Sequence, residues 1–158
     1  MSTEKIRPLD EAVAWTEQAR RTGKTVALAN GVFDLLHVGH VRYLQGAKRL
    51  ADVLVVAINS DASTRAYKGP GRPVVPEAER AELVAALGCV DHVVLFDEPD
   101  VRALLRALKP DVQVKGSDYT EDTVPERDVV LSYGGRVAIA GDPKDHSSTA
   151  LLEKLKKG

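Results

Sequence analysis

Residues 30–40 are Asn30-Gly31-Val32-Phe33-Asp34-Leu35-Leu36-His37-Val38-Gly39-His40, and they lie between an apolar run at 26–29 and an amphipathic run at 41–50. This context predicts a strand, a tight loop and a helix in that order. Gly39 would let a ligand approach the backbone closely, and the free N–H groups at the helix start offer an anion site. His37 and His40 add donors that can take positive charge. We therefore interpret the turn as a binding site for a phosphate chain; the alternative is a helix start with two incidental surface histidines.

The pattern Gly-x-Phe-Asp-x-x-His-x-Gly-His at 31–40 resembles the signature of the cytidylyltransferase-like nucleotidyltransferases, and the resemblance extends over roughly residues 25–155. These enzymes join a nucleoside monophosphate from an NTP to a phosphorylated small molecule and release pyrophosphate. The resemblance implies that His37 and His40 are catalytic. It also implies that the nucleotide is bound by Gly31, Val32, Phe33, Asp34, His37, Gly39 and His40.

The length of 158 residues indicates a single domain, 1–158, that can bury a sizeable core. Within it we expect an N-terminal helical extension at 1–23 and a core at 25–155. The net charge of −1 argues against a bulk nucleic-acid or membrane binder. No signal peptide or membrane-length apolar run is present, so we expect a cytoplasmic location. The single cysteine, Cys89, cannot form an internal disulfide.

Strand-like and helix-like segments alternate along the chain without an internal repeat. Asp10 is expected to cap the first helix and Gly23 to end it. The apolar runs are continuous, which is typical of parallel strands buried on both faces. The expected helices are 9–22, 41–50, 76–84, 99–108 and 125–133, and the expected strands are 25–29, 53–58, 91–96, 111–114 and 136–140. The predicted fold class is α/β, a Rossmann-like domain with a parallel sheet of about five strands flanked by helices.

Residues 65–73 form a basic segment rich in glycine and proline, which composition alone would assign to a solvated connector. The segment follows the second expected strand, and ligands of open α/β sheets bind outside the carboxyl ends of the strands. Lys68 could therefore close over a triphosphate and balance its charge. The resemblance implies such a lysine but does not decide between Lys68 and Arg72.

Arg80 matches an arginine that recurs at this point of the family, and the resemblance implies a nucleotide contact for it. The alternative is a surface arginine paired with Glu77 or Glu79. His92 lies inside an expected strand, a position that favours a structural role.

The fourth expected strand runs into Lys115-Gly116-Ser117-Asp118-Tyr119. This block resembles the branch of the family that makes ADP-heptose, whereas the cytidylyltransferase branch tends to have Met-Gly-Asp-Asp-Trp here. The resemblance implies that Lys115 is catalytic and faces the phosphate of the acceptor. It implies substrate contacts by Asn30, Lys115, Gly116, Asp118 and Tyr119.

Ser147, Ser148 and Thr149 precede an apolar run, which predicts a helix N-terminus that can also hold phosphate. The family carries Ser-Thr-Thr here, so the resemblance implies nucleotide contacts for all three residues. Cytidylyltransferases usually precede this motif with an arginine and Gly-Ile, whereas this chain has Asp142 and His146. That departure argues against CTP.

The most specific expectation is an adenylyltransferase that joins AMP from ATP to D-glycero-β-D-manno-heptose 1-phosphate, giving ADP-heptose and pyrophosphate by direct in-line attack. One alternative is a cytidylyltransferase that uses CTP with glycerol 3-phosphate or phosphoethanolamine, and another is a non-catalytic nucleotide-binding module. Mg²⁺ is expected on the ATP, without a dedicated metal site made of protein ligands. We also expect a separate heptose kinase upstream and no nucleic-acid or membrane partner. A homodimer is an option that no sequence pattern locates.

Overall fold

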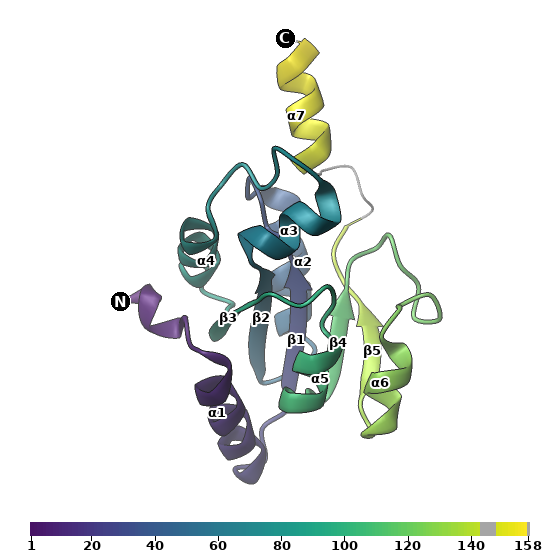
Figure 1. The fold of residues 1–158 in the computed structure, drawn as a ribbon. Coiled ribbons are helices and arrows are strands. Elements are labelled where there is room, and N and C mark those ends of the chain that lie inside the picture. The colour runs from purple at the N-terminus through teal and green to yellow at the C-terminus, as the bar shows by residue number, and fades with distance from the viewer. Residues whose placement is uncertain (143–147, 158) are drawn as a thin grey trace.

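The computed structural model describes residues 1–142 and 148–157. A five-stranded, wholly parallel sheet with the order β3-β2-β1-β4-β5 forms its centre (Figure 1). The strands are β1 (Val26–Gly31), β2 (Val53–Asn59), β3 (His92–Phe96), β4 (Val112–Lys115) and β5 (Arg136–Ile139). The predicted Rossmann-like α/β fold is confirmed.

Helices cover both faces of the sheet, because successive side chains of a strand point to opposite sides. Val26 and Leu28 pack with the helices of one face, while Ala27 and Ala29 pack with those of the other. The first face carries α1 (Leu9–Arg21), α5 (Arg102–Leu108) and α6 (Arg127–Ser132), and the second carries α2 (Val38–Lys48) and α4 (Glu77–Ala85). The remaining helices are the 3-10 helix η1 (Ser2–Lys5), α3 (Asp61–Lys68) and α7 (Ser148–Lys157).

The strand order reverses beside the central strand β1. The chain leaves β1 for the side of β2 through α2, and it leaves β4 for the side of β5 through α6, on the opposite face. Connections that diverge in this way leave a crevice at the carboxyl ends of the two strands, which is where open α/β sheets bind ligands. Figure 1 shows α3 crossing this end of the sheet and α7 projecting beyond it.

The N-terminal segment lies against the outer edge of β3. Ile6 forms a parallel bridge with Val93, and the N–H of Arg7 donates to the Val93 carbonyl at 2.9 Å. The Arg7 side chain donates from Nε to Nδ1 of His92 at 3.2 Å, and the Trp15 ring lies 3.8 Å from the His92 ring. Burial and the Arg7 charge lower the pKa of His92 to about 4. This buried, neutral histidine sits at the amino end of its strand and has the structural role that the sequence favoured.

Two local predictions were wrong. Helix α1 is preceded by Pro8 rather than capped by Asp10, and no side chain makes a cap hydrogen bond there. Residues 65–68 belong to α3, although they were expected in a loop. Ser60 begins that helix by accepting a hydrogen bond from the Ser63 N–H at 3.2 Å, so a serine cap outweighed the glycine and proline that follow.

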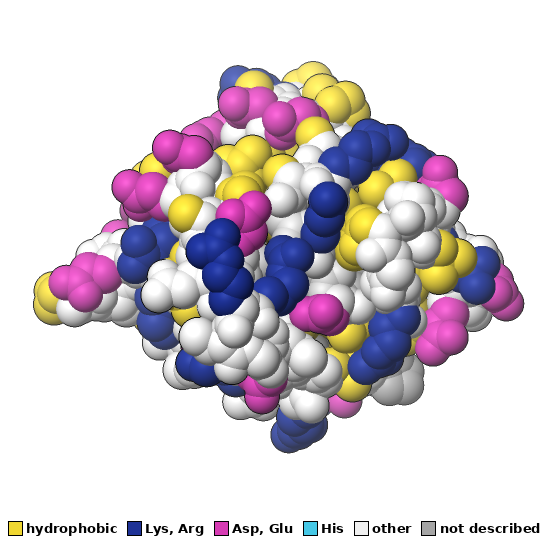
Figure 2. Space-filling view, turned by 90° about the horizontal axis from the view of Figure 1, so that it is seen from below, with side chains coloured by type: hydrophobic (Ala, Val, Ile, Leu, Met, Phe, Trp, Pro, Cys, Tyr) yellow, Lys and Arg dark blue, Asp and Glu magenta, His cyan; other side chains and the backbone are white. Residues whose placement is uncertain are grey.

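The opposite end of the molecule, where the strands begin, carries acidic and basic side chains intermixed over its surface (Figure 2). None of the helices in the described ranges is long and apolar enough to cross a membrane.

Candidate active site

A cleft of about 590 Å³ opens at the carboxyl edge of the sheet, where the strand order reverses. It brings together most of the residues that the sequence analysis assigned to the site. The predicted residues that line the cleft are Asn30, Gly31, Val32, Phe33, Asp34, His37, Gly39, His40, Lys68, Lys115, Gly116, Asp118 and Tyr119. The rest of the wall is made of residues to which the sequence analysis assigned no contact: Tyr43, Asn59, Tyr67, Phe96, Pro99, Asp100, Ser117, Pro125, Glu126, Ala140, Gly141 and Asp142.

The two predicted histidines cap helix α2. His37 is the N-cap residue, and its Nδ1 accepts from the Gly39 N–H at 3.1 Å. His40 reaches back, and its Nδ1 accepts from the His37 N–H at 3.2 Å. This reciprocal arrangement is a capping box in which imidazoles take the places of the usual Ser/Thr and Glu/Gln.

The capping bonds determine how the imidazoles face the cleft. A ring nitrogen that accepts a hydrogen bond carries no proton, so in each neutral ring the proton resides on Nε2. The rings of His37 and His40 stack with centroids 3.9 Å apart and an angle of 27° between their planes. The Phe33 ring supports His40 at 5.4 Å. The helix start thus places the stacked imidazoles of His37 and His40 beside its own backbone N–H groups, a set suited to phosphate oxygens.

The loop before α2 is strained. Phe33 and Leu35 have φ values of 54° and 49°, in the left-handed region that side chains other than glycine rarely adopt. Such residues cost on the order of 1–3 kcal/mol each and persist when their surroundings hold them. A Cβ on Gly31 would lie 3.2 Å from the Phe33 ring, so glycine is what lets that ring turn back over the strand end.

Asp34, between the two strained residues, supplies the restraint. Its buried carboxylate accepts from the N–H groups of Val74 and Val75 at 2.8 and 3.0 Å and from Nε of Arg72 at 3.1 Å. Burial raises the pKa of Asp34, but these hydrogen bonds prevail and hold the pKa below its usual value. The predicted nucleotide-binding aspartate therefore anchors residues 72–75 against the β1–α2 loop. Arg72 makes this pairing through Nε and does not line the cleft, whereas Lys68 does.

Arg80 lies behind the cleft wall and is fully buried. Its guanidinium donates to the carbonyls of Val75, Val32 and Asn59 at 2.6–2.8 Å, and Nη2 pairs with Asp61 at 2.8 Å. The alternative of a surface pair with Glu77 or Glu79 is therefore wrong. In this structure Arg80 joins the loops after β1 and β2 to the start of α4, and it is not among the residues that line the cleft.

The end of the cleft near β4 combines a lysine with carboxylates. Nζ of Lys115 lies 4.8 Å from the centre of the Tyr119 ring, within the range of a cation–π contact. Burial lowers the pKa of Lys115, while the charges of Glu126 and Asp118 act against that shift. The lysine is thus a partly desolvated cation whose attraction for an anionic group is stronger than that of a fully hydrated one.

The loop after β5 closes the cleft on its other side. Ser117 Oγ donates to the Asp142 carbonyl at 2.6 Å, and the Asp142 carboxylate pairs with Arg42 of α2. Arg42, 100 positions earlier in the sequence, therefore lies beside Asp142. The sequence-based argument against CTP stays a prediction. Ser147 and His146 lie outside the described residues, and Ser148 and Thr149 begin α7. The predicted phosphate contacts of the serine–threonine motif stay predictions.

Within the described ranges, no group of three or more His, Cys, Asp or Glu side chains could hold a metal ion. Magnesium brought by a triphosphate would be bound by phosphate oxygens and water, as is usual for this ion.

Comparisons with known proteins agree with this geometry. Residues 28–153 match the family model described as cytidylyltransferase-like. The chain is 52% identical over 151 residues to the bifunctional protein HldE of Syntrophotalea carbinolica, covering 96% of this chain and 31% of that protein. It is 50% identical over 154 residues to the bifunctional protein HldE of Geobacter metallireducens, covering 98% and 31%. The chain thus spans about a third of the length of these curated relatives.

A solved structure shows the same similarity in three dimensions. It is the lipopolysaccharide core biosynthesis protein from Thermoplasma volcanium GSS1, with 30% sequence identity and a TM-score of 0.66. The match covers 77% of this chain and 100% of that one.

Proposed function

Because this chain belongs to the cytidylyltransferase-like family, we propose that it is an adenylyltransferase that joins AMP from ATP to D-glycero-β-D-manno-heptose 1-phosphate. The products are ADP-heptose and pyrophosphate. The observation that carries the proposal is the histidine capping box at the start of α2, which lies in one cleft with Lys68 and Lys115. Side chains that can bind phosphate thus lie on both sides of a crevice at the sheet edge. This arrangement fits a reaction between two phosphorylated molecules.

The reaction is an in-line displacement at the α-phosphorus of the triphosphate. An oxygen of the sugar phosphate forms the new P–O bond, and the bond from the α-phosphorus to the bridging oxygen of the β-phosphate breaks, so pyrophosphate departs with the electron pair. A phosphate monoester loses its second proton near pH ~6, so the nucleophile is already an anion and needs no general base. The protein's tasks are positioning and charge stabilisation.

The residues of the cleft divide these tasks. The Nε2–H groups of His37 and His40 and the N-terminus of α2 hold the triphosphate and stabilise the charge that builds up as pyrophosphate leaves. Lys68, at the end of α3, binds the β- and γ-phosphates and balances their charge. Lys115 holds the acceptor phosphate against the α-phosphorus and offsets the repulsion between the two anions. Magnesium, when bound to the triphosphate, neutralises part of its charge.

The choice of ATP and a heptose phosphate is supported by the Lys115-Gly116-Ser117-Asp118-Tyr119 block. It is also supported by the similarity to the HldE proteins and to a lipopolysaccharide core biosynthesis protein. We further propose that the protein acts in the cytoplasm, where ATP is available.

The test is pyrophosphate release with magnesium, heptose 1-phosphate and each of ATP, CTP, GTP and UTP in turn. Release with ATP alone is expected, and a folded His40→Ala protein should lose it by orders of magnitude. Release with CTP alone, or only with glycerol 3-phosphate as acceptor, would overturn the assigned substrates. Binding of ATP without release under any pairing would overturn the enzymatic activity in favour of a nucleotide-binding module.

A further inference from the structure

A buried carboxylate that the sequence analysis did not single out lines the cleft close to Lys115. Glu126 directly precedes α6, and it is among the residues that line the cleft although it is only 5% exposed. Among the described residues, Gln113 is its side-chain hydrogen-bond partner, donating from Nε2 to Oε2 at 3.3 Å. A carboxylate withdrawn from water is costly unless it is well paired. One hydrogen bond from a neutral amide leaves acceptor capacity on Glu126 for a bound molecule.

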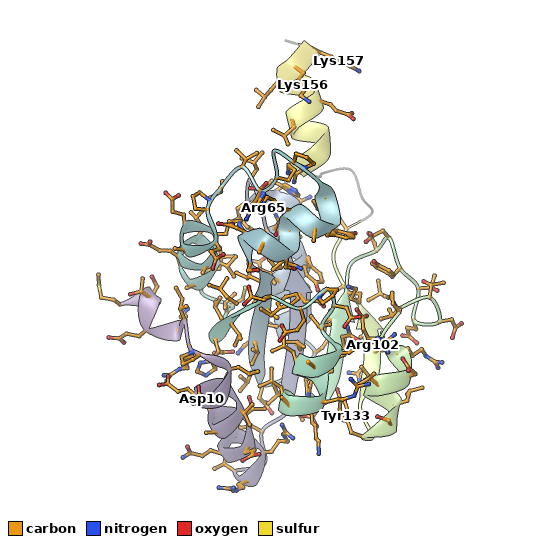
Figure 3. The ribbon with its side chains drawn as sticks, in the orientation of Figure 1. Asp10, Arg65, Arg102, Tyr133, Lys156 and Lys157 are labelled. Carbon is orange, nitrogen blue, oxygen red and sulfur yellow. The ribbon has the colours of Figure 1, made fainter. Side chains whose placement is uncertain are left out.

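The surroundings hold Glu126 in place on both sides. Gln113 lies on β4, between β1 and β5, and is fully buried. On the other side, Arg102 at the start of α5 donates to the Pro125 carbonyl at 2.7 Å and pairs with Asp128 at 2.9 Å. Figure 3 shows Arg102 lying between α5 and α6. A carboxylate fixed this way is preorganised for a specific contact rather than free to turn into solvent.

The neighbours of Glu126 indicate what kind of molecule it contacts. Lys115 and Glu126 line the same cleft and influence each other electrostatically. The ring of Tyr119, with which Lys115 is in contact, offers an apolar face beside them. A sugar phosphate matches this set, because one ring carries a phosphate for the lysine, hydroxyl groups for the carboxylate and C–H groups for the aromatic face.

We propose that Glu126 is a specificity-determining residue, which accepts a hydrogen bond from a sugar hydroxyl of the ligand whose phosphate lies beside Lys115. This inference rests on the proposed function and deepens it. Both reactants present the required chemistry, since the acceptor is a sugar phosphate and the nucleotide carries a ribose. An acidic side chain that binds ribose hydroxyls is a familiar arrangement in the dinucleotide-binding α/β folds.

The test compares Glu126→Gln with the matched control Glu121→Gln, which changes an exposed glutamate in the loop before α6 that does not line the cleft. Glu126→Gln keeps the size of the side chain and its bond to Gln113, but it removes the charge and presents an amide donor to the ligand. Calorimetry would measure binding of ATP, of 2′-deoxy-ATP and 3′-deoxy-ATP, and of heptose 1-phosphate with a non-hydrolysable ATP analogue. Thermal unfolding would show that both variants are folded.

We expect Glu126→Gln to weaken one sugar ligand by about ten- to a hundredfold, as for loss of a hydrogen bond to a charged group. Weaker binding of heptose 1-phosphate with unchanged binding of ATP would show that Glu126 contacts the acceptor. Weaker ATP, with a reduced preference for ATP over one deoxy analogue, would assign it to the ribose. If Glu126→Gln bound every ligand as tightly as Glu121→Gln does, the inference would be overturned. It would also be overturned if Glu126→Gln weakened the binding of ATP and of both deoxy analogues by the same factor and left the binding of heptose 1-phosphate unchanged. Calorimetry needs no turnover, so a wild-type protein that binds both ligands without releasing pyrophosphate would overturn the proposed function alone.

Discussion

Two substitutions of His37 can separate its structural role from its chemical role. The imidazole caps α2 through Nδ1, which accepts from the Gly39 N–H at 3.1 Å. In the proposed reaction its Nε2–H is the group that contacts the triphosphate. Asparagine is among the best N-cap residues and can accept the same bond, but it has no donor at the position of Nε2. Alanine provides neither group. Both variants lose the stacking against His40, so the difference between them isolates the cap.

The structure sets the expected magnitudes. Loss of an N-cap costs about 1 kcal/mol, which for a domain of this size corresponds to a Tm lower by roughly 2–4 °C. His37→Ala should show that shift, and His37→Asn should remain close to the wild type. Removal of one donor that stabilises transition-state charge costs about 10²–10³ in kcat, and both variants should show this loss.

The assays are pyrophosphate release for kcat and thermal unfolding followed by circular dichroism for Tm. If His37→Asn regained near-normal kcat while His37→Ala did not, the contribution of His37 to catalysis would be the cap alone. The role assigned to its Nε2–H would then be refuted.

Three further predictions follow from the same geometry. Asp34→Asn should reduce the free energy of unfolding at pH 7 by about 3–5 kcal/mol, as for a broken buried ion pair. Hydrogen bonding lowers the pKa of Asp34 in the folded state despite its burial, so the difference in unfolding free energy between variant and wild type should shrink as the pH falls below the unfolded pKa of about 3.9. Urea titrations at several pH values would measure this difference, and a difference that stays constant with pH would contradict the assigned ion pair. Lys68→Ala changes an exposed side chain, so it should leave Tm within about 1 °C of the wild type and raise the KM for ATP. Arg72→Ala should instead lower Tm, because it removes the bond to Asp34. The reverse pattern would show that Arg72 binds the triphosphate. Lys115→Met should raise the KM for the acceptor more than that for ATP, and equal losses in steady-state kinetics would move Lys115 to the nucleotide side.

Much of the fold could be predicted because its information is local. A parallel strand buried on both faces needs an unbroken apolar run, and 26–29 and 53–58 show one directly in the sequence. The histidine turn was likewise visible, since His37 and His40 are three residues apart and their mutual capping is a contact within one helical turn.

The parts that could not be predicted depend on contacts between distant segments. Arg80 donates to Val32, 48 positions earlier, and no local pattern distinguishes such a buried arginine from one on a helix surface. Glu126 was missed for the same reason, because only its bond to Gln113 and its low exposure set it apart from the other glutamates of the chain. Local composition also gave a wrong prediction at 65–68. The glycines and prolines that follow these residues indicated a loop, whereas the residues belong to the helix that Ser60 begins.

The pairing of the N-terminal segment with β3 has a consequence for solubility. An edge strand exposes a row of unpaired backbone groups on which strands of other molecules can add. Ile6 and Arg7 occupy part of that row through the bridge and hydrogen bond to Val93, and they place a charged side chain beside it. The segment that precedes α1 thereby shields the sheet against intermolecular strand pairing. A truncation that begins after Pro8 should aggregate at concentrations at which the longer chain stays dispersed.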